Sequence, residues 1–381
     1  MAESVSTHTA VAHTSQRDAL APLPRPDRRI HGSRVKKNTG MIKSVRYLTY
    51  DTVELIVKCD AGSQPLNAVA GQYATLKTEG LEKPRSYSFA RAPSMEAKDE
   101  CTFFVRMVHG GVFSGWLFER DRTGEPIEIS GPLGKFRLDD SNQKMIAIAG
   151  GSGMSAIISL LEDAAKRKVK RDCLFFYGGR TQRDLYCKEE IEEIRKNWHS
   201  DCKFESVMVL SEEPAGSGWS GATGFVTDYF NKQYLATGKL STDNTKVYFC
   251  GPPPMVDAGI SLLTQKGLSR HDIHYDKFED AKSPAPVIDN VACVLCDECL
   301  LVKPVDNCIV EVSALKRNPA NGGFSDYARV DPAYTSGIYY NTLYIDEKEC
   351  IRCYACVEAC PVGAISPLFD KTPNTLRQTV E

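Results

Sequence analysis

The sequence predicts a multidomain protein with an antiparallel β-barrel, an α/β domain with a parallel sheet, and a small cysteine-rich α+β domain. Residues 39–140 contain short β-branched and aromatic runs between glycine and proline turns, which is typical of barrels. Residues 141–281 alternate buried-strand and helix patterns, which indicates a parallel sheet with helices on both faces. Residues 291–381 contain eight of the 14 cysteines, in two closely spaced runs.

The predicted barrel strands are rich in β-branched and aromatic side chains. Glycine and proline separate the runs, so each strand is expected to end in a turn. Their regular spacing favours a small closed barrel. The runs are TVELIVKC (52–59), GQYATLKT (71–78), CTFFVRMV (101–108) and EPIEIS (125–130).

The predicted parallel sheet begins with MIAIAG (145–150), a continuous apolar run that ends in a glycine turn. The next segment, MSAIISLLEDAAKR (154–167), has apolar residues at helical spacing. Strand and helix patterns then alternate to the end of the domain. The further strands are expected at 173–179, 205–211 and 246–251, and the helices near 187–196, 224–233 and 254–266.

The remaining segments and the composition limit the class of protein. Residues 1–38 are polar and contain proline, so we expect a flexible tail, and the Pro-rich residues 282–290 are expected to be a linker. The N-terminus lacks the apolar core of a secretory signal, and no run of about 18 apolar residues predicts a membrane span. A net charge of −2 argues against general nucleic-acid binding. We expect a cytoplasmic protein whose thiols stay reduced.

The cysteine spacing predicts two [4Fe-4S] clusters. The second run has the C-x2-C-x2-C-x3-C-P spacing of bacterial ferredoxins, in which the fourth ligand of each cluster comes from the other run. Eight residues separate Cys299 from Cys308, which departs from that pattern and makes Cys308 the least secure ligand. One cluster is assigned to Cys293, Cys296, Cys299 and Cys360, and the other to Cys350, Cys353, Cys356 and Cys308.

Zinc and disulfides are the alternatives for these cysteines. Zinc usually takes two C-x2-C pairs, whereas these runs are triplets, and the second ends in Cys-Pro. Disulfide frameworks are typical of short secreted chains, and this chain is long and has no secretory signal. The spacing therefore favours iron–sulfur ligation.

Four more motifs follow predicted strands, and each has an ordinary structural interpretation when taken alone. RSYS (85–88) is compatible with an exposed strand end, VHGGVFSGWL (108–117) with a hairpin turn and an N-cap serine, IAGGSGMSAI (148–157) with a tight strand-to-helix turn, and Cys250 of CGPPPM (250–255) with a buried core thiol. Each also fits nucleotide binding, because guanidinium groups and glycine turns that open helices bind phosphates. Ligands of open parallel sheets bind at the carboxyl ends of the strands.

In this order the four motifs resemble the ferredoxin–NADP reductase family, in the branch of oxygenase reductases, over about residues 40–280. The resemblance implies FAD, with Arg85 at the pyrophosphate, Tyr87 on the isoalloxazine and Ser88 near its N5. The other FAD contacts that we assign are Ser86, Gly111, Val112 and Ser114. It also implies a nicotinamide dinucleotide, whose contacts are expected at Gly150, Gly151, Ser152, Gly153, Arg180, Cys250, Gly251 and Pro252. Arg180 and Arg183 suit a 2′-phosphate, but Asp184 disfavours one, so we expect NADH, with NADPH as the alternative.

The implied function is an NAD(P)H-dependent electron-transfer reductase. A hydride passes from NAD(P)H to FAD, and single electrons pass through two [4Fe-4S] clusters to a partner protein, the terminal component of a multicomponent oxygenase. Ser88 and Cys250 are the expected catalytic residues, because they would align the hydride path. Reductases of this branch usually carry a two-iron C-x4-C-x2-C ferredoxin, which is absent here. The alternatives are a reductase for a non-oxygenase electron chain and a non-catalytic electron-transfer adaptor.

Overall fold

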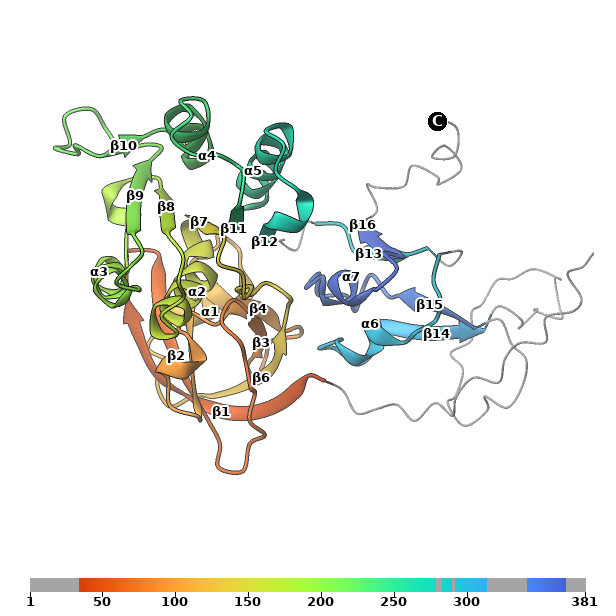
Figure 1. Ribbon diagram of the computed structural model, residues 1–381. Coiled ribbons are helices and arrows are strands. Elements are labelled where there is room, and N and C mark those ends of the chain that lie inside the picture. The colour runs from red at the N-terminus through yellow and green to blue at the C-terminus, as the bar shows by residue number, and fades with distance from the viewer. Residues whose placement is uncertain (1–33, 279–282, 290–291, 314–340, 368–381) are drawn as a thin grey trace, which may run out of the picture. The chain divides into compact units, whose positions relative to one another are not determined.

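The computed structural model describes residues 34–278, 283–289, 292–313 and 341–367, all of which belong to one unit of the chain. Most of the predicted tail, residues 1–33, lies outside the described residues. Figure 1 shows the order of the elements along the chain. We call residues 34–278 the reductase part and the described residues from 283 to 367 the cluster module. Among the described residues, no helix is both long and apolar enough to cross a membrane.

The first half of the reductase part is one antiparallel sheet in the order β4-β3-β6-β1-β2-β5. An isolated bridge between Phe89 and Phe103 brings the chain after β4 back to β5, which closes the sheet into a barrel. Leu55, Leu76 and Ile129 point inward and are fully buried. The elements are β1 Lys36–Tyr47, β2 Thr52–Cys59, β3 Tyr73–Lys77, β4 Arg85–Ser88, β5 Glu100–Arg106, α1 Val112–Glu119 and β6 Pro126–Leu133.

The two sheets of the reductase part share strand β5. Phe103 and Val105 belong to the barrel core, whereas Phe104 between them belongs to the core of the second sheet. Side chains alternate across a strand, so one strand can serve two cores. This explains why β5 is buried along nearly its whole length. The barrel is therefore packed directly against the α/β domain.

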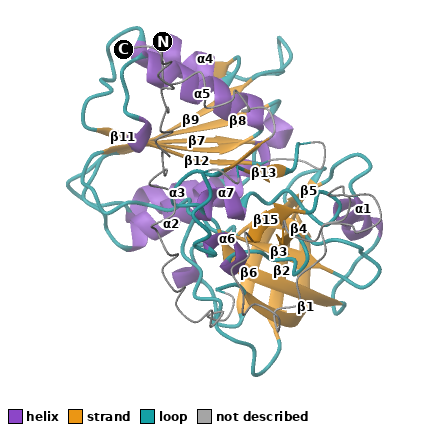
Figure 2. Cartoon of the chain, turned by 90° about the vertical axis from the view of Figure 1, so that its right-hand side faces the viewer, coloured by secondary structure: helices purple, strands orange, loops and turns teal. Residues whose placement is uncertain are grey.

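The second sheet is parallel, in the order β10-β9-β8-β7-β11-β12. Figure 2 shows helices on both of its faces, with α4 and α5 on one side and α2 and α3 on the other. Strand order reverses between β7 and β11, and open parallel sheets bind ligands at such a switch point. The elements are β7 Lys144–Gly150, α2 Met154–Lys166, β8 Cys173–Gly179, α3 Lys188–Asn197, β9 Phe204–Leu210, β10 Ala222–Thr223, α4 Val226–Phe230, β11 Thr245–Gly251, α5 Pro253–Gln265 and β12 Ile273–Lys277.

The cluster module has two small antiparallel sheets and two short helices. Strand β13, Pro286–Ile288, lies inside the expected linker 282–290 and pairs with β16, Ile365–Pro367. A pairing between residues this far apart leaves no local pattern, so the sequence did not indicate it. The other elements are α6 Glu298–Leu301, β14 Ile309–Ser313, β15 Asn341–Ile345 and α7 Ala355–Ala359. The domain boundaries at 38, 140, 281 and 290 remain predictions.

Candidate functional site

The glycine turn and the Cys-Gly-Pro motif meet at the switch point of the parallel sheet. Gly150 ends β7, Gly251 ends β11, and Cys250 pairs with Ala149 between the two strands. A Cβ on Gly153 would strike the carbonyl of Cys250, so only glycine permits the start of α2 to lie this close. Gly251 has φ +152°, which also disfavours a side chain. Ser152 lies in the same turn, and Pro252 directly precedes α5. At the carboxyl ends of β7 and β11, these residues therefore form a surface that consists mainly of backbone atoms.

The RSYS motif forms strand β4, whose residues pair with β3. Arg85 donates from Nη1 to the carbonyls of Lys83 (3.2 Å) and Pro84 (3.0 Å), which hold the guanidinium at the start of the strand. Tyr87 packs on Phe113 with ring centroids 5.1 Å apart. Ser86 is exposed between them, whereas Ser88 at the strand end is buried. The strand therefore presents a cation, a ring and a hydroxyl in succession.

The glycine–serine turn precedes helix α1. Gly111 occupies the N-cap position without a side-chain cap, which leaves main-chain donors of the first turn available. Ser114 accepts a hydrogen bond from the Val108 N–H (3.1 Å), so its hydroxyl closes the loop and does not cap the helix. Val112 is exposed at the first helical position. Phe113, on the same turn, contacts Tyr87, so this motif and RSYS lie side by side.

Asp276 is a site residue that sequence reasoning missed. It lies on β12, opposite Cys250 on β11, and its carboxylate is 3.5 Å from the Ser88 hydroxyl. Burial and the nearby Glu358 raise the pKa of Asp276 to about 7, although the Ser88 hydrogen bond lowers it. The one sequence signal for it is an acidic residue within the last strand of the parallel sheet, in HYDKF (274–278). Three residues from separate motifs, Ser88, Cys250 and Asp276, thus converge.

Cys250 is fully buried at this point. Burial raises the pKa of its thiol well above the ordinary value, and the Asp276 carboxylate adds to the rise. The side chain is therefore a neutral thiol at neutral pH. Phe278 closes the same region, because its N–H donates to the Gly251 carbonyl (3.2 Å).

The segment that contains Arg180 and Arg183 is organised around Asp184. Its carboxylate accepts hydrogen bonds from the Thr181 N–H (2.8 Å) and hydroxyl (2.9 Å). The first is one half of a capping box, in which the Thr181 side chain accepts from the Asp184 N–H. Arg180 donates to Asp184 (2.9 Å) and to the Tyr50 hydroxyl (2.6 Å), and lies 3.4 Å from the Asp51 carboxylate. Although burial alone would raise it, these bonds hold the pKa of Asp184 below its ordinary value. Both side chains are therefore charged and already paired.

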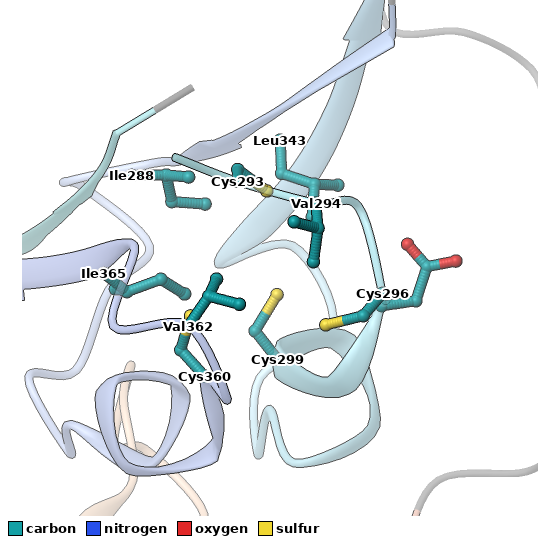
Figure 3. A pocket seen from close by; sticks show the side chains of 10 residues that line it. Ile288, Cys293, Val294, Cys296, Cys299, Leu343, Cys360, Val362 and Ile365 are labelled. Atoms are coloured by element: carbon teal, nitrogen blue, oxygen red, sulfur yellow. The ribbon is translucent and has the colours of Figure 1, made fainter. Parts of the chain in front are cut away.

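The first thiol set, which we define as Cys293, Cys296, Cys299 and Cys360, surrounds one pocket. Figure 3 shows these side chains around the pocket, together with Val294 and Val362. Cys360 comes from the second cysteine run, as the spacing predicted. Burial raises the pKa of Cys299 to about 12, and Cys293 and Cys296 add to the rise. Such thiols release protons when they bind a metal.

The second thiol set, which we define as Cys308, Cys350, Cys353 and Cys356, is more deeply buried. Burial and the neighbouring Cys350 raise the pKa of Cys308 to about 11. Cys308 in turn lies within electrostatic reach of Cys353 and Cys356 and contributes to the raised pKa of each, after burial. The structure therefore places Cys308 beside the second cysteine run. Within the described part of the chain, no three His, Cys, Asp or Glu side chains meet closely enough to hold a single metal ion.

Family models match three segments of the chain. An oxidoreductase FAD-binding domain matches residues 40–138, an oxidoreductase NAD-binding domain matches 147–259, and a 4Fe-4S binding domain matches 343–366. The last match contains the second cysteine run. The cofactor types predicted from the motifs are thereby confirmed, whereas the number of clusters remains a prediction.

Curated relatives match about two thirds of the chain. The xylene/toluene monooxygenase electron transfer component XylA of Pseudomonas putida is 40% identical over 242 residues, which are 64% of this chain and 65% of XylA. The phenol 2-monooxygenase reductase component DmpP of Pseudomonas sp. (strain CF600) is 34% identical over 255 residues, 67% of this chain and 69% of DmpP. The chain thus spans slightly less than two thirds of XylA and slightly more of DmpP.

Solved structures show the same relationship. The ferredoxin reductase in carbazole 1,9a-dioxygenase has a TM-score of 0.55 at 31% identity and covers 64% of this chain and 70% of its own. The Amycolatopsis cytochrome P450 reductase GcoB has a TM-score of 0.56 at the same identity and coverage. The predicted fold classes are confirmed. The chain belongs to the ferredoxin–NADP reductase-like flavoprotein reductases, in the branch of oxygenase reductase components, and carries a C-terminal 4Fe-4S binding domain.

Proposed function

We propose that this reductase oxidises NADH at a bound FAD and delivers single electrons through two [4Fe-4S] clusters to the terminal component of an oxygenase. When bound, FAD and the clusters supply the conversion of a two-electron donor into one-electron steps. The observation that carries the proposal is the convergence of Ser88, Cys250 and Asp276 at the switch point, in a chain whose first thiol set lines one pocket. The protein's own residues bind, orient and shield these groups.

The flavin site is assigned to β4 and the start of α1. Among the described residues, the hydrogen-bond acceptors of the Arg85 guanidinium are main-chain carbonyls, so its charge is available to a pyrophosphate. Gly111, Val112 and Ser114 would hold the same pyrophosphate with main-chain donors. Ser86 and Tyr87 would contact the cofactor beside them. Ser88 would hydrogen-bond the reacting edge of the ring.

The nicotinamide site is assigned to the switch point. Gly150, Gly151, Ser152 and Gly153 would approach the phosphates with main-chain N–H groups, because their turn opens helix α2. Cys250, Gly251 and Pro252 would lie against the nicotinamide. A neutral, buried thiol at Cys250 excludes water from the hydride path and adds no charge to it. Cys250 and Ser88 are therefore the residues that we assign to hydride alignment.

We favour NADH over NADPH because of the pairing of Arg180. A 2′-phosphate near Arg180 would also face the carboxylates of Asp51 and Asp184, and both already accept its hydrogen bonds. Arg183 is stacked on the Tyr50 ring at 4.8 Å and supplies the other nearby cation. We expect kcat/KM to be at least about tenfold higher with NADH. Equal kcat/KM values for the two cofactors would contradict this preference.

The partner and compartment are inferred from the relatives and the thiols. XylA and DmpP are named for xylene/toluene and phenol monooxygenases, and further relatives for propane 2-monooxygenase, so an oxygenase component is the proposed acceptor. The eight thiols must stay reduced to bind iron, so a cytoplasmic location is part of the proposal. The cluster module replaces the usual two-iron ferredoxin of the branch, so a non-oxygenase acceptor is the second candidate.

An anaerobic titration with NADH tests the proposal. The purified protein should show a flavin band and a broad iron–sulfur shoulder, and NADH should bleach both. Two clusters require about eight iron atoms per chain. An NADH-inert flavin would indicate the adaptor alternative, and an iron content near four would contradict the second cluster. Reduction of a co-expressed oxygenase component, compared with a generic one-electron acceptor, separates the two candidate partners.

A further inference from the structure

Specific hydrogen bonds join the cluster module to the antiparallel barrel of the reductase part. The Tyr73 hydroxyl on β3 donates to the Cys353 carbonyl at 2.8 Å. The Lys135 N–H, just after β6, donates to the Glu358 carboxylate of α7 at 2.9 Å. Within the barrel, the Gln72 side chain stabilises the turn before Lys135 by donating to the Gly134 carbonyl (2.9 Å). The first two bonds join the second cysteine run to a barrel strand and to the turn that follows one.

The contact also has an apolar interior. Tyr73 is only 6% exposed and packs with Val35 and Leu133 of the barrel and with Ala355 of α7. Val302 and Cys353 cover the edge of this cluster. By contrast, the ion pairs Lys37–Asp306 and Arg34–Glu298 are solvent-exposed, and such pairs contribute little. Tyr73 is therefore the central residue of the contact.

The cysteine loop is fixed from its other side by the segment that enters the module. Arg352 donates to the Ser283 carbonyl (2.7 Å), and the Tyr354 hydroxyl donates to the Pro284 carbonyl (2.6 Å). In the sequence, both residues lie between Cys350 and Cys356. The loop that carries the second thiol set is thus held on both sides.

The position of this loop relative to the flavin site follows from the strand register. Tyr73 pairs with Ser88 across β3 and β4, and Ser88 reaches Asp276. Glu358, which lies on α7, is close enough to Asp276 for its negative charge to raise the pKa of Asp276, after burial. The second thiol set therefore adjoins the residues that we assign to hydride transfer. The first set borders solvent, where Cys296 is exposed and Val294 and Val362 are 61% and 48% exposed.

We infer that Tyr73 and Glu358 are positioning residues that hold the second thiol set against the antiparallel barrel. Electrons then enter the cluster module at the second set and leave it from the first. The inference rests on the proposed function. One NADH would give up two electrons and one proton as a hydride. The two electrons would leave the flavin one at a time through the second set, one of them passing on to the first set, and the proton would pass to solvent. Each electron enters at the second set because electron transfer slows steeply with distance.

Tyr73→Phe tests the inference, because it removes the hydroxyl and keeps the ring. In stopped-flow experiments we expect NADH to reduce the flavin at the wild-type rate within about twofold and the clusters to be reduced about tenfold more slowly. KM for NADH should stay unchanged while kcat with an external acceptor falls. Tyr47→Phe is the matched control, since Tyr47 is 61% exposed on β1 and packs edge-on against Phe118.

A spectroscopic readout separates positioning from general damage. In the reduced protein, Tyr73→Phe and Glu358→Ala should each alter the electron paramagnetic resonance signal of one cluster and leave the other unchanged. The altered signal should be the one that Cys353→Ser abolishes, and not the one that Cys296→Ser abolishes. Glu358→Gln keeps an acceptor for the Lys135 N–H and should restore most of the wild-type behaviour.

The outcomes distinguish the inference from the proposed function. A wild-type flavin that NADH does not reduce contradicts the proposed function. A flavin that is reduced normally, combined with wild-type cluster rates and signals in both Tyr73→Phe and Glu358→Ala, overturns the inference alone. Persistent reduction of the first set by NADH in Cys353→Ser protein would also overturn it, because the entry would then lie at the first set.

Discussion

The reductase part and the cluster module differ in what fills their interiors. In the reductase part, hydrocarbon and aromatic side chains such as Leu55, Phe103, Phe175 and Phe249 are completely buried. In the module, Cys299, Cys308, Cys350 and Cys356 are among the buried core residues, between two-stranded sheets. Burial of apolar surface stabilises the first. We expect so small a core as the second to depend on metal ligation to stay folded.

Removal of iron should have the largest effect and should be confined to the module. A chelator under reducing conditions, or Cys350→Ser, should abolish hydrogen-exchange protection in residues 341–367, because ligand bonds replace a core there. Protection in the parallel sheet should persist. The matched control is Cys202→Ser, a partly exposed thiol of the reductase part. Simultaneous loss of protection in both parts would refute the contrast.

A cavity in the barrel should have the opposite effect: it should destabilise the reductase part and leave iron binding by the module unchanged. Leu55→Ala removes a fully buried side chain and should lower the free energy of unfolding of the reductase part by about 2–5 kcal/mol. Iron content per folded chain should stay at the wild-type value, since the thiols in the core cluster of Leu55 are Cys59 and Cys101, which belong to neither thiol set. Chemical denaturation followed by flavin release, with an iron assay on the same samples, measures both quantities.

Ser88→Ala should alter chemistry without altering either interior. We expect flavin reduction by NADH to slow about 10- to 100-fold, because the hydroxyl near Asp276 no longer orients the reacting edge. Cluster spectra should be unchanged. Stopped-flow absorbance measures the rate, and Ser200→Ala, at an exposed serine, is the control. An unchanged rate would remove Ser88 from the hydride path.

Glu96 should give a small pH effect in the reductase part alone. Burial raises its pKa to about 7, although hydrogen bonds from Thr102 lower it. The folded state therefore holds the proton more tightly than the unfolded state, so stability should fall as pH rises from about 4.5 to 7. Glu96→Gln should remove this slope and stabilise the protein at pH 8 by about 1–3 kcal/mol. Thermal melts across that pH range, with exposed Glu79→Gln as the control, measure it.

Local patterns in the sequence predicted the elements with regular periodicity and the grouping of the thiols. The helix expected at 154–167 is α2, Met154–Lys166, and Cys360 lines the pocket of the first run as its spacing implied. Contacts between distant residues were not predictable. Asp276 joins Ser88 across 188 residues, and Tyr73 reaches Cys353 across 280 residues. Each of these residues has an ordinary local context, so only the folded chain reveals its role.

The pairing of β13 with β16 has an architectural consequence. Residues 286–288 precede the first cysteine run and residues 365–367 follow the second, and the two strands lie side by side. The two ends of the described module therefore lie at one edge. A module whose two ends lie together can be exchanged between reductases as one unit. Evolution can thus change the electron carrier of such an enzyme without redesigning its flavin domain.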